Sequence, residues 1–241
     1  MFQQYKLRQT ITTYDGQSFF LIQNFLSVDA MYYVFQYHGS IVIVYNEHWE
    51  YQRSVLLPQA PTSSILANGQ IYTSNSNIIK YDKYLNITAH SNDFSGYRGL
   101  YFNSTNGLIY SGDCSRNKIK IFNQSLSLVN SFNITFLPCS ITEHNQMIVI
   151  TDQTSGFINF YQNNIFITKI LTQCGSVKSV LFDDYNHMIV LCETSYVYIY
   201  HTNGSYTGIS IKGCSSYAYY MNFDSKDRLV LICSNDIDIY Y

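Results

Sequence analysis

The strongest constraint on the fold is an internal repeat of about 40 residues. A short segment in which a polar residue precedes an apolar run recurs along the chain, for example as NGLIYSGD at 106–113 and NHMIVLCE at 186–193. The residues at the equivalent position are Met31, Gln70, Leu108, Met147, Met188 and Leu229, spaced 39, 38, 39, 41 and 41 residues apart. A fixed period between 20 and 50 residues indicates a repeat architecture. The chain is therefore expected to contain six structural units.

A second pattern keeps the same register. Each copy is followed by a short run that ends in an aromatic residue, as in IVIVY at 41–45 and KIKIF at 118–122. These terminal rings are Tyr45, Tyr81, Phe122, Tyr161, Tyr200 and Tyr240. Because two separate markers agree over all six copies, the repeat is interpreted as one structural unit used six times.

Each unit is predicted to contain four short strands. In the third unit they are expected at 98–103, 108–112, 118–122 and 126–132, with polar turns between them. The composition agrees, since 24 Tyr and 15 Phe suit half-buried sheets. Second and third strands that are apolar on both faces favour sheets packed between neighbours. We predict an all-β, six-bladed β-propeller with four antiparallel strands per blade, forming a single domain over residues 1–241.

The ends of the repeat predict how the ring closes. The sixth unit contains three predicted strands, and one additional strand at 5–12 precedes the first unit. An unpaired strand and an unfilled position would each leave an exposed sheet edge. We therefore expect the N-terminal strand to complete the last blade.

The third unit carries a family resemblance. RGLYFNSTNGLIY at 98–110 is followed by GDCSRNKIKIF at 112–122. This order of an acid, a short loop and Asn-basic-Ile-x-Ile-Phe resembles the NHL-repeat β-propellers, best over residues 98–132. The resemblance implies a propeller fold, and some propellers of this broad group are lyases or hydrolases with central metal ligands. WD40 repeats fit less well, because Trp49 lies between predicted strands and no Trp-Asp pair occurs.

Candidate binding residues gather where first strands begin and second strands end. Antiparallel pairing places these points on the same face of the ring. The residues there are Arg98, Lys178, Tyr219, Asp113, Asp152 and Glu193. We expect them to surround the mouth of the central channel and to form a docking surface for a protein or peptide partner. The alternative is structural: the acids cap turns by accepting backbone N–H groups, and the two cations are ordinary solvated residues.

The cysteines are expected to be reduced thiols. They are Cys114, Cys139, Cys174, Cys192, Cys214 and Cys233. Strand register places Cys192 opposite Lys178, four residues from Cys174, and Cys233 opposite Tyr219, five residues from Cys214. At about 3.3 Å per residue, such separations exceed the span of a disulfide. Cys114 and Cys139, on neighbouring blades, are the pair that the sequence leaves open.

Charge and motifs limit the function classes. The chain has 14 basic and 16 acidic residues without a basic run, which excludes a nucleic-acid surface. Its apolar runs are too short for a membrane-spanning helix. No metal-binding spacing and no Gly-x-Ser-x-Gly motif occurs, so no catalytic residue, metal ligand or cofactor is predicted.

These exclusions favour a non-enzymatic binding scaffold. We expect a monomeric domain, either alone or within a longer polypeptide, whose partner is a protein or peptide. One alternative is a carbohydrate-binding propeller that uses the tyrosines at 217–220, because their rings can stack on sugars. The other alternative is a metal-dependent lyase or hydrolase. The sequence does not indicate a compartment.

Overall fold

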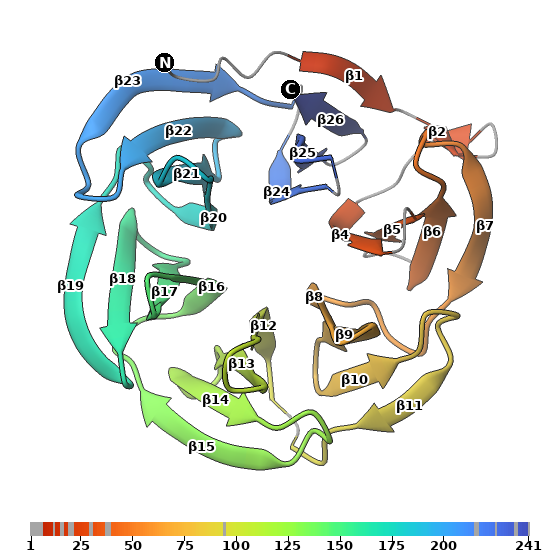
Figure 1. The fold of residues 1–241 in the computed structure, drawn as a ribbon, viewed down its shortest axis with the longest axis horizontal. Helices are drawn as coiled ribbons and strands as arrows, with labels where there is room; N and C mark the ends of the chain where they lie inside the picture. Colours follow the sequence, from red (N-terminus) through yellow and green to blue (C-terminus); the bar gives the residue numbers. More distant parts are fainter. Residues whose placement is uncertain are drawn as a thin grey trace.

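The chain forms six small sheets arranged around a central axis (Figure 1). The computed structural model describes residues 7–11, 13–14, 17–18, 22–28, 31–36, 40–93, 95–214, 217–224, 226–233 and 236–240, with side chains from residue 31 onward. In each sheet the strands follow one another outward from the axis (Figure 1). This arrangement is a six-bladed β-propeller.

The first three blades hold residues 22–133. Blade one contains β4 (Ile22–Val28), β5 (Met31–Gln36), β6 (Ile41–Tyr45) and β7 (Tyr51–Leu56). Blade two contains β8 (Ser63–Ala67), β9 (Gln70–Ser74), β10 (Ile78–Tyr81) and β11 (Ile87–His90). Blade three contains β12 (Tyr97–Asn103), β13 (Leu108–Asp113), β14 (Lys118–Phe122) and β15 (Leu128–Asn133).

The other three blades follow the same order. Blade four contains β16 (Pro138–His144), β17 (Met147–Asp152), β18 (Phe157–Gln162) and β19 (Ile165–Leu171). Blade five contains β20 (Val177–Phe182), β21 (His187–Cys192), β22 (Tyr196–His201) and β23 (Tyr206–Lys212). Blade six contains β24 (Ala218–Phe223), β25 (Leu229–Cys233) and β26 (Ile237–Tyr240).

The N-terminal residues add a strand and a small hairpin. β1 (Leu7–Ile11) pairs antiparallel with β26, with Thr10 opposite Asp238. A hairpin of β2 (Thr13–Tyr14) and β3 (Gln17–Ser18) follows it. Residues 5, 6 and 12 of the expected N-terminal strand lie outside the described residues. No helix in the described part of the chain is long and apolar enough to cross a membrane.

The prediction of an all-β propeller with six blades is confirmed. In blade three the predicted strands differ from the observed strands by at most two residues at either end. Five of the six repeated positions open the second strands, as with Leu108 in β13 and Met147 in β17, and Met188 is the second residue of β21. Periodic apolar patterning therefore located the strands correctly.

The core is divided among six apolar clusters, and each cluster lies between two neighbouring blades. One cluster joins Tyr72 and Ile78 of blade two to Ile109 and Phe122 of blade three. The six repeated aromatic rings are distributed one to each cluster, and all are at most 6% exposed. Burying a side chain of this size contributes about 1.5–3 kcal/mol. The rings thus hold each blade against its neighbour.

Blades six and one are packed together in the same way. Val230 and Ile239 of blade six contact a cluster that contains Tyr32 and Trp49 of blade one. The Trp49 ring is buried and stacks on Tyr32, with ring centroids 4.2 Å apart. The single tryptophan is therefore a core residue at the junction of the first and last blades.

A buried polar link crosses the same junction. The Arg228 Nε atom donates to Asp224 Oδ2 at 2.6 Å, and its Nη2 atom donates to the Tyr32 hydroxyl at 2.9 Å. The Tyr32 hydroxyl lies 3.3 Å from Asp224 Oδ2, to which it donates. Because the arginine and the aspartate are almost fully buried, their charges compensate each other in a medium that solvates neither well.

The expectation of reduced thiols was wrong for four cysteines. Cys174 is bonded to Cys192, with Cα atoms 5.3 Å apart, and Cys214 is bonded to Cys233, with Cα atoms 5.6 Å apart. Both Cys174 and Cys214 precede the first strand of their blade, in a connection that turns instead of extending the strand. A positive φ of 32° at Cys214 is part of that turn. Counting extended residues therefore overestimated the separation.

The pair that the sequence left open is not bonded. Cys114 and Cys139 are free thiols, and Cys114 Sγ lies 3.2 Å from the carbonyl oxygen of Pro138. The disulfides instead occupy matching positions in blades five and six.

Candidate functional site: the mouth of the central channel

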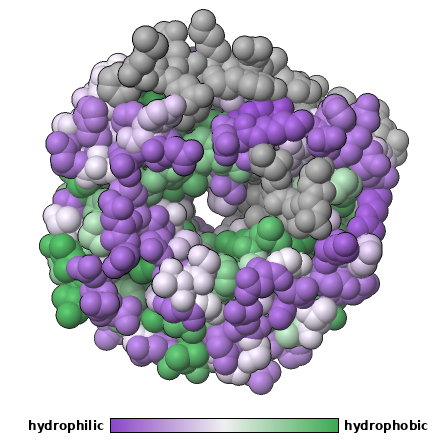
Figure 2. All heavy atoms as spheres, viewed as in Figure 1, coloured by the Kyte–Doolittle hydropathy of each residue, from purple (hydrophilic) through white to green (hydrophobic). Residues whose placement is uncertain are grey.

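A cavity of about 520 Å³ lies at the centre of the ring. It is lined by residues of the innermost strands β8, β12, β16, β20 and β24, and an opening is visible at the centre of the molecular face in Figure 2. Arg98, Lys178 and Tyr219 all line this cavity. The structure therefore brings three of the six predicted binding residues together, from three different blades.

Local irregularities in the innermost strands shape this part of the channel. The pairing of first and second strands shifts register at Gly99 in β12, at Lys178 in β20 and at Tyr219 in β24. Such bulges redirect side chains. Gly99 has a φ of +64°, and a Cβ atom there would lie 2.9 Å from the carbonyl oxygen of Cys139. The close approach of blades three and four at the channel thus requires a glycine at this position.

Glu193 lies at the edge of the cavity rather than in it. Its carboxylate pairs with the Lys178 ammonium at 2.8 Å, with side-chain exposures of 51% for Glu193 and 20% for Lys178. Arg98 is exposed, and it has no ion pair within the described part of the chain. The two cations therefore differ: the charge of Lys178 is balanced by Glu193, whereas the guanidinium of Arg98 is available to a ligand.

Asp113 and Asp152 hold turns. Asp113 is fully buried, its Oδ1 accepts the Ser115 N–H at 3.1 Å, and its Oδ2 lies 2.9 Å from the Lys120 ammonium. Asp152 is 8% exposed, and its Oδ1 accepts the Thr154 N–H at 2.9 Å. The capping interpretation is confirmed for both acids. Neither of them lines the cavity.

The charge on Asp113 is stabilised from several sides. Burial raises the pKa of this carboxyl, but the neighbouring Ser95 hydroxyl and the ammonium of Lys120 lower it, so that the net pKa lies below its ordinary value. Lys120 is itself buried and also pairs with Asp93 at 2.7 Å. This ion-pair group fixes the turn between β13 and β14 on the side of the ring that carries Arg98.

Sequence reasoning missed several residues in the cavity wall. They are Tyr101, Cys139, Ser140, Ser179 and Asn222. All five lie on innermost strands close to the bulges. Alternation along those strands would have identified some of them, but the bulges shift the alternation by one residue.

The described wall of the cavity carries cationic, hydroxyl, thiol and aromatic groups. None of the described lining residues is a histidine, an aspartate or a glutamate, although carboxylates stand just behind the wall: the Tyr101 hydroxyl donates to Glu143 Oε2 at 2.6 Å, and the Lys178 ammonium pairs with Glu193 at 2.8 Å. Burial raises the pKa of the Cys139 thiol, against the opposing effects of Lys178 and Arg98. A thiol of this kind is protonated near neutral pH and is a weak nucleophile. Two cations, hydroxyl groups and aromatic rings together fit an anionic or polar ligand.

Two histidines flank first-to-second-strand turns, His144 at the end of β16 and His187 at the start of β21, and they have separate structural partners. His144 stacks on Phe182 with ring centroids 4.1 Å apart, and burial lowers its pKa. The Nδ1 atom of His187 lies 2.9 Å from Asp183 Oδ2. Both are at the opposite end of their strands from the channel mouth. They therefore do not contribute to the candidate site.

Comparison with known proteins supports the fold alone. No family model matches the sequence, and no curated protein matches it. A chain in the solved structure described as "Crystal Structure of Mitotic Checkpoint Complex" is similar over 91% of this chain and 74% of that chain, with a TM-score of 0.69 and 13% identity. The chain is a β-propeller. At this identity the similarity of the propeller carries no functional assignment.

Proposed function

We propose that this propeller is a non-enzymatic binding platform that docks an acidic segment of a protein partner at the channel mouth. One observation carries the proposal: Arg98, Lys178 and Tyr219, from three different blades, line one cavity whose described wall contains no carboxylate. Cations in a concave, partly desolvated site attract anionic groups more strongly than cations on an open surface. An aspartate, a glutamate or a terminal carboxylate of a peptide fits this chemistry.

The six predicted residues have different roles in this proposal. Arg98 offers its guanidinium to a partner carboxylate in a bidentate manner. Tyr219 provides an aromatic contact with a polar end. Lys178 binds the partner, and Glu193 orients the Lys178 side chain through the 2.8 Å ion pair between them. Asp113 and Asp152 fix the rim turns and do not touch the partner.

The finer architecture is part of the proposal. We propose that residues 1–241 act as one monomeric propeller domain of NHL-like type, with four strands per blade and with β1 as the closing strand of blade six. The antiparallel register of β1 on β26 and the motif at 98–122 support it. A rigid closed frame allows loops on one face to bind a partner without a large cost in stability.

A peptide-display selection tests the docking proposal. Random peptides with free C-termini are selected on the wild-type chain, and the affinities of the enriched peptides are measured by fluorescence anisotropy. We expect enrichment of Asp, Glu or terminal carboxylates. The double variant Arg98→Glu, Lys178→Glu should bind these peptides at least tenfold more weakly, about 1.4 kcal/mol.

The matched control is a double variant with the same change in charge, made at two positions away from the channel. Arg53 lies on the outer strand β7, and Lys83 lies in the turn between β10 and β11; both are exposed. The variant Arg53→Glu, Lys83→Glu should therefore bind as the wild type does. Equal losses in the two double variants, or enriched peptides without acidic groups, would contradict the proposal.

A further inference from the structure

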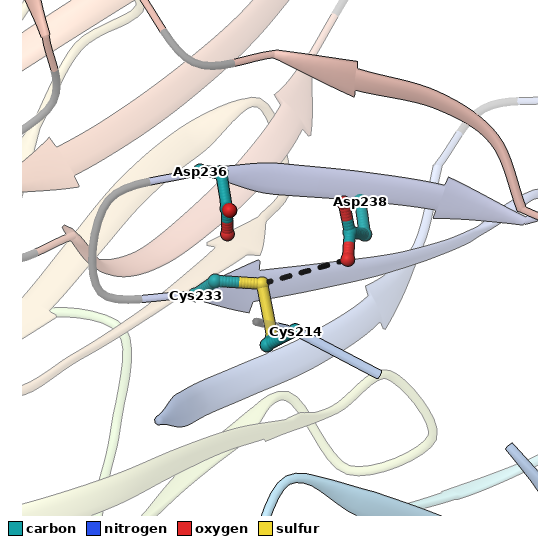
Figure 3. A group of neighbouring side chains, drawn as sticks. All are labelled: Cys214, Cys233, Asp236 and Asp238. Atoms are coloured by element: carbon teal, nitrogen blue, oxygen red, sulfur yellow. Dashed lines mark hydrogen bonds between the residues drawn. A yellow bond between two sulfur atoms is a disulfide. The ribbon is translucent and has the colours of Figure 1, made fainter. Parts of the chain in front are cut away.

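Four potential metal ligands meet inside blade six, away from the channel mouth. They are Cys214, Cys233, Asp236 and Asp238, which are all buried and at most 9% exposed. The sulfur atoms and one oxygen atom of each carboxylate lie within 4.8 Å of one another. Figure 3 shows both aspartates from the β26 segment pointing toward the cysteine pair. Such a group of soft and hard donors has no role in the docking surface proposed above.

The fold of the blade brings these residues together. Asp236 and Asp238 are two residues apart, so their side chains point to the same face of the sheet. Strand β26 pairs with β25, which ends at Cys233, and the Cys233 N–H donates to the Asp236 carbonyl oxygen at 3.0 Å. Cys233 Sγ lies 3.9 Å from Asp238 Oδ2. The turn before β24 adds Cys214 from the other side.

We propose that the reduced form of this cluster binds a zinc ion. Two thiolates and two carboxylates are a ligand set that Zn²⁺ accepts in tetrahedral geometry. With Zn–S near 2.3 Å and Zn–O near 2.1 Å, neighbouring donors in a tetrahedron are about 3.4–3.8 Å apart. The two sulfur atoms, once their bond is reduced, need to separate by about 1.8 Å, and the other donors, observed within 4.8 Å, need to approach by only about 1 Å.

Zinc binding and the disulfide exclude each other. A dithiol reductant supplies two electrons and two protons to the bond between Cys214 and Cys233, and the reductant itself becomes a disulfide. Zn²⁺ then binds both sulfurs as thiolates and releases the two protons. In the oxidised chain neither sulfur carries the negative charge that holds zinc. The site is therefore a redox-controlled metal site that forms only in a reducing environment.

Blade five provides an internal comparison. It carries the same type of disulfide, between Cys174 and Cys192. At the positions that match the two aspartates it has Tyr196 and Tyr198, since Tyr198 pairs with Val190 as Asp238 pairs with Leu231. A reduced pair in blade five therefore lacks the two carboxylates, and the proposal predicts zinc at one of the two cysteine pairs only.

Metal titration of the full chain tests the proposal. The protein is reduced with a phosphine under anaerobic conditions, and Zn²⁺ binding is measured by calorimetry, with Co²⁺ as a spectroscopic substitute. We expect one tight site in the reduced chain and none in the oxidised chain. Asp236→Asn with Asp238→Asn should weaken binding at least tenfold, and Tyr196→Phe with Tyr198→Phe should leave it unchanged.

Thiol mapping keeps the proposal testable if the aspartate variant does not fold. Reduced wild-type protein is alkylated with and without Zn²⁺, and the modified cysteines are identified by mass spectrometry. Selective zinc protection of Cys214 and Cys233 supports the site. Equal protection of the cysteine pairs in blades five and six, or no protection in either, overturns it.

Discussion

Arg228 donates a hydrogen bond of 2.9 Å to the hydroxyl of Tyr32, although 196 residues separate them in the chain. The bond joins the last blade to the first at a position where both side chains are buried. It therefore depends on the ring being complete.

The variant Tyr32→Phe removes this hydroxyl and leaves Arg228 with one acceptor fewer. A buried hydrogen bond to a charged group contributes about 1.5–3 kcal/mol, so we expect a loss of that size in the free energy of unfolding. Urea denaturation measures it. Tyr84→Phe, at an exposed ring, is the control and should have no effect. Equal stability of the two variants would contradict the role assigned to the link.

The two disulfides should each stabilise the oxidised chain. Their cysteines are 18 and 19 residues apart, and a loop of about this length corresponds to roughly 3 kcal/mol. Replacing either pair by serine should lower the urea midpoint under oxidising conditions. In a reducing buffer without zinc, the wild type should lose the contributions of both disulfides, about twice the loss expected for one pair. A wild-type midpoint that does not respond to the reductant would rule out this contribution.

Acid should weaken the fold through Asp113. Its pKa in the folded state lies below its ordinary value, so the unfolded chain takes up the proton first as pH falls. The stabilisation is complete above the unfolded pKa of about 3.9 and is lost as pH falls below it. Asp113→Asn should therefore be less stable than the wild type at pH 7, with a difference that shrinks below about pH 4.

Urea midpoints between about pH 3 and pH 7 measure this difference. Asp184→Asn is the control, because Asp184 lies in an exposed turn. A pH-independent gap between Asp113→Asn and the wild type would show that the carboxylate charge is not what the turn requires.

The glycine at the channel bulge should tolerate no side chain. A Cβ atom at Gly99 meets the backbone of Cys139 at 2.9 Å, and its φ is positive. Gly99→Ala should cost about 1–3 kcal/mol. Gly175→Ala, where a Cβ would have no neighbour within 4 Å, is the matched control and should be close to neutral. The comparison requires only thermal or urea melts of the two variants.

The proposed closing strand is testable at Thr10, which pairs with Asp238. Thr10→Pro should disturb the ladder between β1 and β26, since proline cannot donate a backbone hydrogen bond. We expect the melting temperature to fall by at least about 4 °C relative to Thr10→Ala. Identical melting of the two variants would mean that β1 does not support blade six.

The fold could be predicted because its signal is local and periodic. The rings at Phe122 and Tyr200 recur at one place in each unit, and both are buried between blades. The capping of turns by Asp113 and Asp152 could also be predicted, because an acid after an apolar strand is a common capping pattern.

The disulfides, the cysteine–aspartate cluster and the grouping of the cavity residues could not be predicted, because they depend on the course of turns and on the pairing of strands that the sequence pattern does not specify. Cys174 and Cys214 reach their partners through turns, and strand counting cannot follow a turn. The grouping of Asp236 and Asp238 with the cysteines depends on pairing across β25 and β26, and the spacing of these residues matches no metal motif. The convergence of Arg98 and Lys178 depends in the same way on how neighbouring blades are oriented.

Each apolar cluster of this ring belongs to two blades at once. A single blade removed from the chain would expose an apolar surface on both of its faces. The two blades that had been its neighbours would each expose one apolar face as well. We therefore expect partial proteolysis or truncation inside any blade to unfold the whole propeller. We also expect the number of blades to change in evolution only by the gain or loss of whole repeats.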